Sequence, residues 1–134
     1  MNISRKSETA LRLLLLHSTY SVPQPISTRD AASMLRFSVS YVRYLSKILT
    51  YRGHLAAVPG KGFRLGKSPA EISLYSIFNV TQRRPNNSNN IVATEIESDL
   101  GRLLKKINSY EQYRNYTLLD LHMELTSHEI NINL

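Results

Sequence analysis

Residues 38–53, with the sequence SVSYVRYLSKILTYRG, decide the fold that we expect for this chain of 134 residues. Apolar residues recur there at helical spacing and predict one buried stripe: Val42, Leu45, Ile48 and Leu49. Ser38 is suited to cap the start of this helix, and Gly53 is suited to end it. The opposite face carries polar and basic side chains, namely Ser40, Tyr41, Arg43, Tyr44 and Lys47. Such a helix can rest on a core with one face and enter the major groove of DNA with the other.

Two further helices are expected before this segment. The first covers about residues 4–19 and is ended by the prolines that follow, which lack an amide hydrogen. Its inward face is apolar and comprises Ala10, Leu11, Leu14 and Leu15. Ser27 can cap a short second helix, and Asp30 stands three residues further on, as in a capping box. Residues 36–38 then form a tight turn between two helices.

A β-hairpin is expected directly after these helices. Residues 55–58 and 63–65 are short apolar runs suited to strands, and residues 59–62, PGKG, supply the turn. Phe63 and Leu65 should lie on one side of the return strand and Arg64 on the other. The order helix, short helix, tight turn, helix and hairpin is that of a winged helix-turn-helix. The expected fold class is therefore mainly α with a small β-hairpin wing.

The second half of the chain predicts a further unit. A helix over residues 74–80 is followed by a polar loop, and the longest helix should cover about residues 94–115. A last short helix begins at Thr117, which with Asp120 resembles a capping box. We therefore expect three parts: a winged helix-turn-helix domain over residues 1–80, a flexible polar loop over 81–93, and a dimerisation segment over 94–134.

One apolar stripe follows the long helix: Ile96, Leu100, Leu103, Leu104 and Ile107. A helix tied to a small domain by a loose polar loop needs a second hydrophobic surface, and a two-fold dimer is the simplest closed solution. We expect these residues to form the interface of a homodimer. The alternative is that the stripe packs on its own subunit.

Basic residues are concentrated in the first half of the chain. The formal net charge is +7 and the isoelectric point is about 9.9. Residues 1–67 hold 11 Lys and Arg but two acidic residues, whereas the remaining residues hold six basic and eight acidic ones. This asymmetry favours a first half that binds a polyanion, joined to a second half with a different function. The alternative is a basic surface that serves solubility.

The predicted helix-turn-helix and wing therefore provide candidate contacts to duplex DNA. Arg43 can bind guanine in bidentate fashion, and Lys61 and Arg64 on the hairpin can reach a minor groove or phosphates. The start of the second helix offers backbone amides and a cation to a phosphate. The full set is Ser27, Thr28, Arg29, Ser38, Ser40, Tyr41, Arg43, Tyr44, Lys47, Lys61 and Arg64. Taken singly, the basic residues could belong to a solvated helix face, and Tyr41 could be a core residue with an exposed hydroxyl.

The chain resembles the Rrf2 family of bacterial winged-helix transcription regulators over nearly its whole length. The segments that carry the resemblance are residues 7–12, Ile26-Ser27, residues 30–32, residues 37–42 with Leu45, Leu49 and Gly53, residues 59–65, Pro69, residues 72–74, Ile77, and residues 117–121. The resemblance implies a homodimer on a palindromic promoter site, with the long helix of each subunit crossing to its partner. It also implies a repressor more than an activator.

Many members of that family sense through an iron–sulfur cluster held by three cysteines after the wing, whereas this chain has no cysteine. Glu8 stands where some relatives place an acidic ligand of the cluster. One carboxylate without thiolates cannot hold such a cluster, so we interpret Glu8 as structural or as a partner of Arg5 or Arg12. We expect a member without a cluster, without a metal and without another cofactor.

The recognition helix and the wing also depart from the family pattern. Arg43 and Tyr44 stand where relatives often have Glu and Gln, so the preferred bases should differ. Pro59 stands near a position where the family usually has a wing arginine, and Lys61 is the expected substitute.

Other classes of protein find less support in the residues. The four histidines are scattered and no nucleophile motif, phosphate loop or carboxylate pair is present, so we do not expect an enzyme. The longest aliphatic run is residues 13–16, which excludes a membrane span and favours an intracellular protein. The resemblance to the Rrf2 family implies a bacterial cytoplasmic one. The main alternative is a regulator that binds a protein through the long helix, with weak or absent DNA binding. A small-molecule or protein effector remains open.

Overall fold

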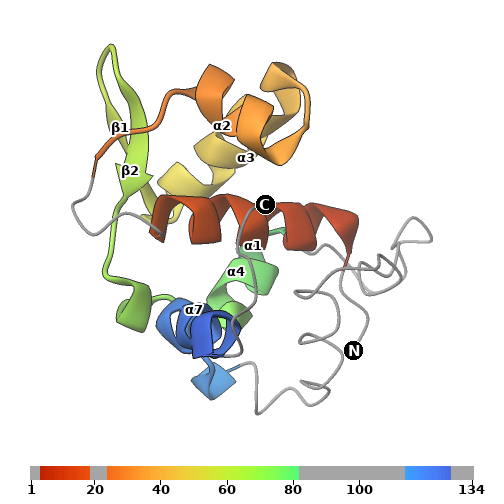
Figure 1. The fold of residues 1–134 in the computed structure, drawn as a ribbon, viewed down its shortest axis with the longest axis vertical. Helices are drawn as coiled ribbons and strands as arrows, with labels where there is room; N and C mark the ends of the chain where they lie inside the picture. Colours follow the sequence, from red (N-terminus) through yellow and green to blue (C-terminus); the bar gives the residue numbers. More distant parts are fainter. Residues whose placement is uncertain (1–3, 19–23, 82–113, 128–134) are drawn as a thin grey trace.

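The computed structural model describes residues 4–18, 24–81 and 114–127 (Figure 1). In chain order they form α1 (Arg5–Ser18), α2 (Thr28–Leu35), α3 (Val39–Tyr51), β1 (Leu55–Val58), β2 (Gly62–Leu65), the 3-10 helix η1 (Pro69–Glu71), α4 (Leu74–Thr81) and α7 (Leu118–Ser127). The winged helix-turn-helix predicted from the sequence is confirmed. The polar loop and nearly all of the long helix expected over 94–115 lie outside the described residues.

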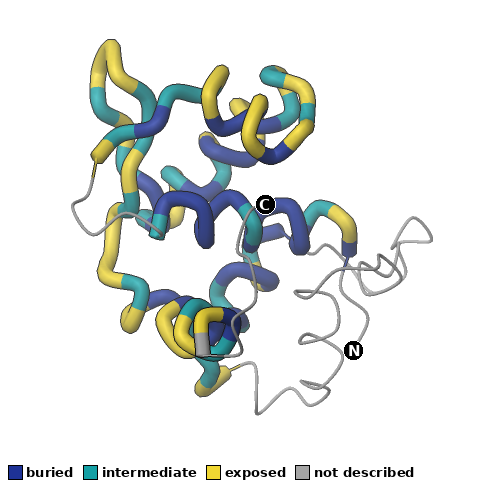
Figure 2. Tube along the Cα trace, viewed as in Figure 1, coloured by how far each residue is buried: buried dark blue, intermediate teal, exposed yellow. Residues whose placement is uncertain are grey.

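α1 is the central helix of the domain. The pair α2 and α3 and the hairpin lie on one side of it, and α4 and α7 lie on the other (Figure 1). A helix that is covered on both sides must be apolar around most of its circumference. Leu13 and Leu16 are accordingly buried in addition to the face predicted from the sequence, and α1 is dark blue over most of its length in Figure 2.

Capping side chains define the helix-turn-helix. The Ser27 hydroxyl accepts a hydrogen bond from the Asp30 amide at 3.0 Å, and the Ser38 hydroxyl accepts one from the Tyr41 amide at 3.2 Å. Both caps agree with the prediction, because a serine oxygen satisfies an amide that has no partner within the helix. α3 ends in a Schellman motif, in which the Gly53 amide bonds the Thr50 carbonyl and the His54 amide bonds the Leu49 carbonyl.

The hairpin is joined to the residue before α2. β1 and β2 pair antiparallel with Leu55 opposite Leu65 and Val58 opposite Gly62. Ile26 forms an isolated bridge with Phe63, in which each amide donates to the other residue's carbonyl at 2.8 and 3.0 Å. The wing is therefore held against the entry to α2, so the two elements keep a defined spacing.

α7 is part of the same core as α1. Leu118, Leu121 and Leu125 are buried, and the Leu118 amide donates to the Ile72 carbonyl at 2.7 Å. The expected capping box is present, since the amides of Thr117 and Asp120 bond each other's side chains. The sequence pattern groups these residues with the long helix in the segment 94–134, whereas the structure packs α7 against α1 and η1.

One turn residue adopts a backbone conformation that favours glycine. Arg36 caps α2 with φ of +63°, and it is the one non-glycine residue with positive φ among those that the structure describes. Its Cβ makes this left-handed conformation unfavourable by about 1 kcal/mol. We expect Arg36→Gly to raise the free energy of unfolding by roughly that amount, as measured by urea denaturation.

Arg52→Gly is the matched control, because Arg52 caps α3 with an ordinary φ of −95°. Relief of strain cannot occur there, so this variant should gain nothing. A lower denaturation midpoint for Arg36→Gly than for the unchanged protein would contradict the interpretation.

Candidate DNA-binding surface

The outward face of α3 carries the polar and basic side chains singled out in the sequence. Ser40, Arg43 and Lys47 are exposed, and Tyr44 is 45% exposed. The inward face is held by the core through Val42, Leu45 and Leu49, whose side chains are fully buried, whereas Ile48 of the predicted stripe is only partly buried. One face of α3 is thus anchored while the other is accessible, which is the arrangement that insertion into the major groove requires.

Tyr41 lies between the core and this surface. It is half-buried, it packs against the core, and its ring centroid is 5.8 Å from that of Phe37. Burial is the main cause that raises the pKa of the Tyr41 hydroxyl. Tyr41 therefore packs as a partly buried residue at the edge of the core.

The two capping serines have a structural task. Because Ser27 and Ser38 accept hydrogen bonds from backbone amides, each hydroxyl retains its proton for a further acceptor such as a phosphate oxygen. Thr28 is half-buried and Arg29 is exposed at the start of α2. The bridge between Ile26 and Phe63 places this helix start beside the wing.

The wing presents two cations. Lys61 lies exposed in the turn, and Arg64 is exposed on β2 while its neighbours Phe63 and Leu65 are partly buried against the core. The Arg64 guanidinium donates to the Leu65 carbonyl at 3.2 Å, which uses one of its five N–H groups. The alternation predicted for the return strand is thus present.

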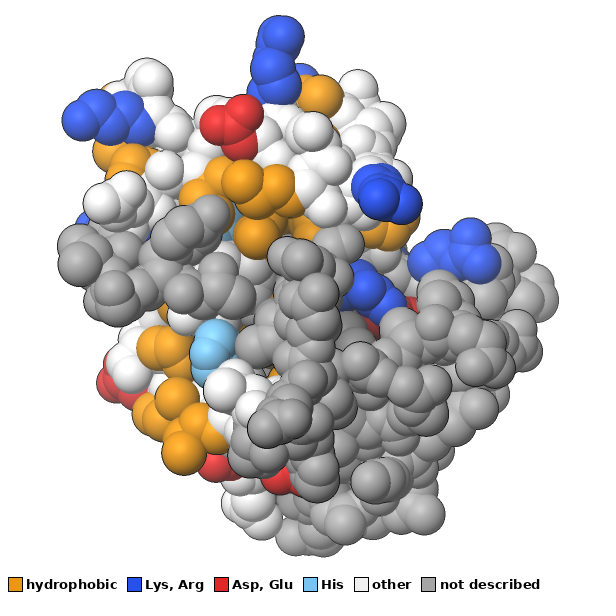
Figure 3. Space-filling view, viewed as in Figure 1, with side chains coloured by type: hydrophobic (Ala, Val, Ile, Leu, Met, Phe, Trp, Pro, Cys, Tyr) orange, Lys and Arg blue, Asp and Glu red, His pale blue; other side chains and the backbone are white. Residues whose placement is uncertain are grey.

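Basic side chains project around the helix-turn-helix and the hairpin. Figure 3 shows Lys and Arg side chains in the upper part of this view with one acidic side chain between them, whereas several acidic side chains lie in the lower part. The bridge between Ile26 and Phe63 brings the wing to the entry to α2, and α2 in turn packs on α3. The predicted interface residues Ile96, Leu100, Leu103, Leu104 and Ile107 lie outside the described residues.

One neighbouring cation was not singled out in the sequence. The Lys6 Nζ atom on α1 donates a hydrogen bond to the Tyr44 hydroxyl on α3 at 2.9 Å. The two residues are 38 positions apart, so no local pattern indicates the contact. The available signal was the helical spacing that left Lys6 off the apolar face of α1.

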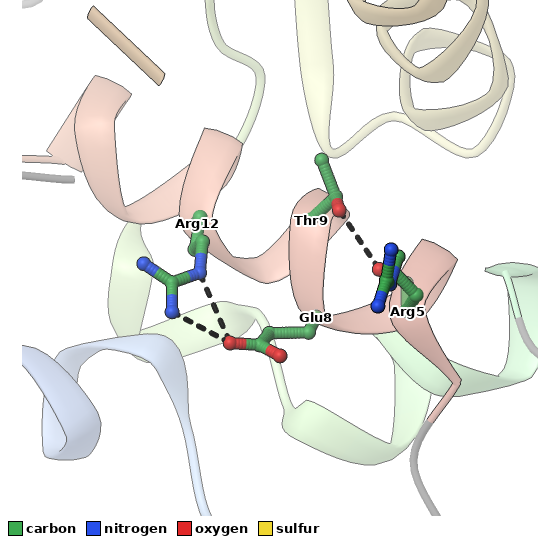
Figure 4. A network of polar contacts seen from close by, with 4 residues as sticks. All are labelled: Arg5, Glu8, Thr9 and Arg12. Atoms are coloured by element: carbon green, nitrogen blue, oxygen red, sulfur yellow. Dashed lines mark hydrogen bonds and ion pairs between the residues drawn. The ribbon is translucent and has the colours of Figure 1, made fainter. Parts of the chain in front are cut away.

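The buried Glu8 forms an ion pair with the partly exposed Arg12 on α1. Its Oε2 atom accepts hydrogen bonds from Nε and Nη2 of Arg12 at 3.0 and 2.6 Å, which identifies Arg12 as the partner (Figure 4). Thr9 donates to the Arg5 carbonyl beside this pair at 2.8 Å. Together with Leu35 and Phe37, these four residues line an open pocket of about 290 Å³. The structural interpretation of Glu8 thus agrees with its contacts.

The residues present do not fit an iron–sulfur cluster. The chain has no cysteine to supply thiolates, and the Glu8 carboxylate is bound by Arg12. Within residues 4–18, 24–81 and 114–127, no group of three or more His, Asp or Glu side chains could hold a metal ion. In the same ranges no helix has the length and apolarity needed to cross a membrane.

Comparison of the sequence with known proteins identifies a family and a relative. A family model described as Rrf2, iron-dependent transcriptional regulator, matches residues 3–124. A protein of Bacillus subtilis (strain 168), named as the putative HTH-type transcriptional regulator YwgB, is 31% identical over 86 residues. That alignment covers 63% of this chain and 55% of YwgB, so the chain matches about half the length of this relative.

Comparison of the fold gives solved structures of similar size. The cysteine regulator CymR of B. subtilis superposes with a TM-score of 0.66 at 22% identity, covering 92% of this chain and 97% of CymR. IscR of T. potens gives a TM-score of 0.70 at 19% identity, covering 98% and 93% of the two chains. At these identities the likeness supports the fold alone.

Proposed function

Because the chain belongs to the Rrf2 family of transcriptional regulators, we propose that it represses transcription as a homodimer bound to a palindromic operator. The observation that carries the proposal is the outward face of α3, where Ser40, Arg43 and Lys47 are exposed on a helix anchored from behind. A cation-rich helix face beside a basic wing matches the major groove and its flanking phosphates.

Each element has a separate task in this proposal. Arg43 reads guanine, because its planar fork of donors matches the O6 and N7 acceptors of that base. Lys47, Lys61 and Arg29 neutralise phosphates, and their contribution is independent of sequence. The amides and hydroxyls at Ser27 and Ser38 add phosphate contacts at two helix starts. Tyr41 supports this surface by packing its ring against Phe37.

Two-fold symmetry would place two copies of α3 in successive major grooves, about 34 Å apart. The stripe from Ile96 to Ile107 supplies the proposed dimer interface. Sedimentation equilibrium of the whole protein tests this part, since a mass of twice 15.3 kDa is expected. A monomer that binds the operator with full affinity would exclude the dimeric arrangement.

The test of DNA binding begins with selection of bound fragments from random duplexes, followed by titration at several salt concentrations. A dimer that neutralises about eight phosphates should give a log–log salt slope of about −7. A nearly flat slope and no enriched sequence would instead favour the alternative, a regulator that acts on a protein partner.

Replacement of Arg43 by alanine should weaken binding to the selected operator by about 1–3 kcal/mol and relax the base preference at one position of each half-site. Lys61→Ala is the control, because a phosphate contact should be lost equally on operator and random DNA. Equal losses for Arg43→Ala on both duplexes would show that Arg43 contacts phosphate and not a base.

A further inference from the structure

A contact between α1 and α3 brings a cation from outside the helix-turn-helix to the edge of the DNA-binding surface. The Lys6 ammonium donates to the Tyr44 hydroxyl at 2.9 Å and lies 5.0 Å from the centroid of the Tyr44 ring. Tyr44 directly follows Arg43 and is 45% exposed, so the contact lies at the surface and not in the core.

The ammonium group keeps capacity for another partner. It has three N–H donors, and one of them is used by the Tyr44 hydroxyl. Within the part of the chain that the structure describes, Lys6 has no further hydrogen bond or ion pair. An exposed hydrogen bond and cation–π contact contribute little to stability. α1 and α3 both contribute fully buried leucines to one core, so the fold does not depend on the Lys6 ammonium group.

The first turn of α1 is held in place by a chain of buried hydroxyls. Ser4 donates to Ser7 at 3.0 Å, Ser7 lies 2.7 Å from the Thr81 hydroxyl on α4, and Thr81 donates to the Ile77 carbonyl at 2.8 Å. Lys6 lies within this turn, so its backbone has a defined position relative to α4 as well as α3. A long, flexible side chain loses less entropy on binding when both its base and its tip are positioned.

We infer that Lys6 is a further DNA contact, which binds a backbone phosphate beside the groove that α3 occupies and is positioned for it by Tyr44. The inference rests on the proposed function. Phosphates line both sides of the major groove, which is about 12 Å wide. A cation held at the edge of the inserted helix by a neighbouring helix lies level with those phosphates and not with the base edges. Its contribution is therefore independent of sequence.

The experiment compares Lys6→Met, Lys6→Arg, Tyr44→Phe and the double variant Lys6→Met/Tyr44→Phe with the unchanged full-length protein. Each is titrated with the selected operator and with a random duplex across a series of salt concentrations. Lys67→Met is the matched control, because Lys67 is an exposed lysine after the wing and has no place in the proposed interface. Far-UV circular dichroism and the denaturation midpoint verify that each variant is folded.

Lys6→Met should weaken binding about tenfold on both duplexes and reduce the salt slope by about 0.9 for each protomer bound. Lys6→Arg should restore the slope, because it restores the charge. Tyr44→Phe keeps the ring but removes the hydroxyl, so a smaller loss of about threefold is expected. Lys67→Met should leave affinity and slope unchanged.

The double variant tests whether Tyr44 acts through Lys6. If it does, adding Tyr44→Phe to Lys6→Met should cause no further loss, because the residue that Tyr44 positions is already gone. Losses that multiply would overturn the positioning role. An unchanged affinity and slope for Lys6→Met would overturn the phosphate contact while leaving the proposed function intact. Failure of the unchanged protein to bind duplex DNA would refute the proposed function, and the inference with it.

Discussion

Replacement of Gly62 by alanine should destabilise the domain by about 3 kcal/mol or more and detach the wing from the entry to α2. Gly62 has φ of +116°, a conformation that side chains rarely adopt. An added Cβ would overlap the carbonyl oxygen of Ile26 and lie 2.6 Å from the Cα atom of Ser27. Both atoms belong to backbone, and the Ile26 carbonyl accepts the hydrogen bond from Phe63, so neither can move without breaking the bridge.

Gly60→Ala separates backbone strain from this steric overlap. Gly60 also has a positive φ, +75°, but a Cβ added there would meet no atom within 4 Å. The Gly60→Ala variant should therefore lose only about 1 kcal/mol of stability, because a side chain disfavours this backbone conformation. Urea denaturation measures both variants, and near-equal losses would show that the contact with Ile26 is readily relieved.

The same pair of variants connects stability to DNA binding. Because the bridge between Ile26 and Phe63 holds the wing beside Ser27, detaching the wing should also separate the cations of the wing from those at the start of α2. At temperatures where Gly62→Ala is still folded, its loss of operator affinity should exceed that of Gly60→Ala.

The features that could be predicted from the sequence are those that neighbouring residues determine. A serine oxygen at Ser27 or Ser38 meets an amide three residues away, and Gly53 closes a motif within six residues. These local signals predicted where α2 begins and where α3 begins and ends. The 3-10 helix η1 was not predicted, although Ser68 and Glu71 form a capping box at its start.

The features that could not be predicted depend on contacts between distant segments. The hydrogen bond from Lys6 to Tyr44 spans 38 residues, and that between Ser7 and Thr81 spans 74. The helical period of α1 identified one apolar face, but whether a second face is covered depends on where α4 and α7 pack. For the same reason the sequence placed α7 with the long helix, since an amphipathic period does not say which partner buries it.

Lowering the pH from 7 towards 4 should destabilise the domain by about 3 kcal/mol through His17 alone. Burial lowers the pKa of His17 from its ordinary 6.5 to about 4. His17 lies in the last turn of α1, where the helix dipole favours a cation, but the loss of hydration on burial outweighs that effect. Above about pH 6.5 the imidazole is neutral in both states, and its full contribution to stability is present.

Between pH 6.5 and about 4 the unfolded chain takes up the proton first, so the free energy of unfolding falls by about 1.4 kcal/mol for each pH unit. Below about pH 4 both states are protonated and this loss stops. His17→Gln should therefore reduce the number of protons taken up on unfolding by close to one, as measured by urea denaturation at about pH 7 and about pH 4.5.

Burial also lowers the pKa of His54, whose Nε2 atom lies 3.1 Å from the Ser76 hydroxyl. The double variant His17→Gln/His54→Gln should consequently flatten the profile further. A profile for His17→Gln parallel to that of the unchanged protein would show that folding does not lower the pKa of His17.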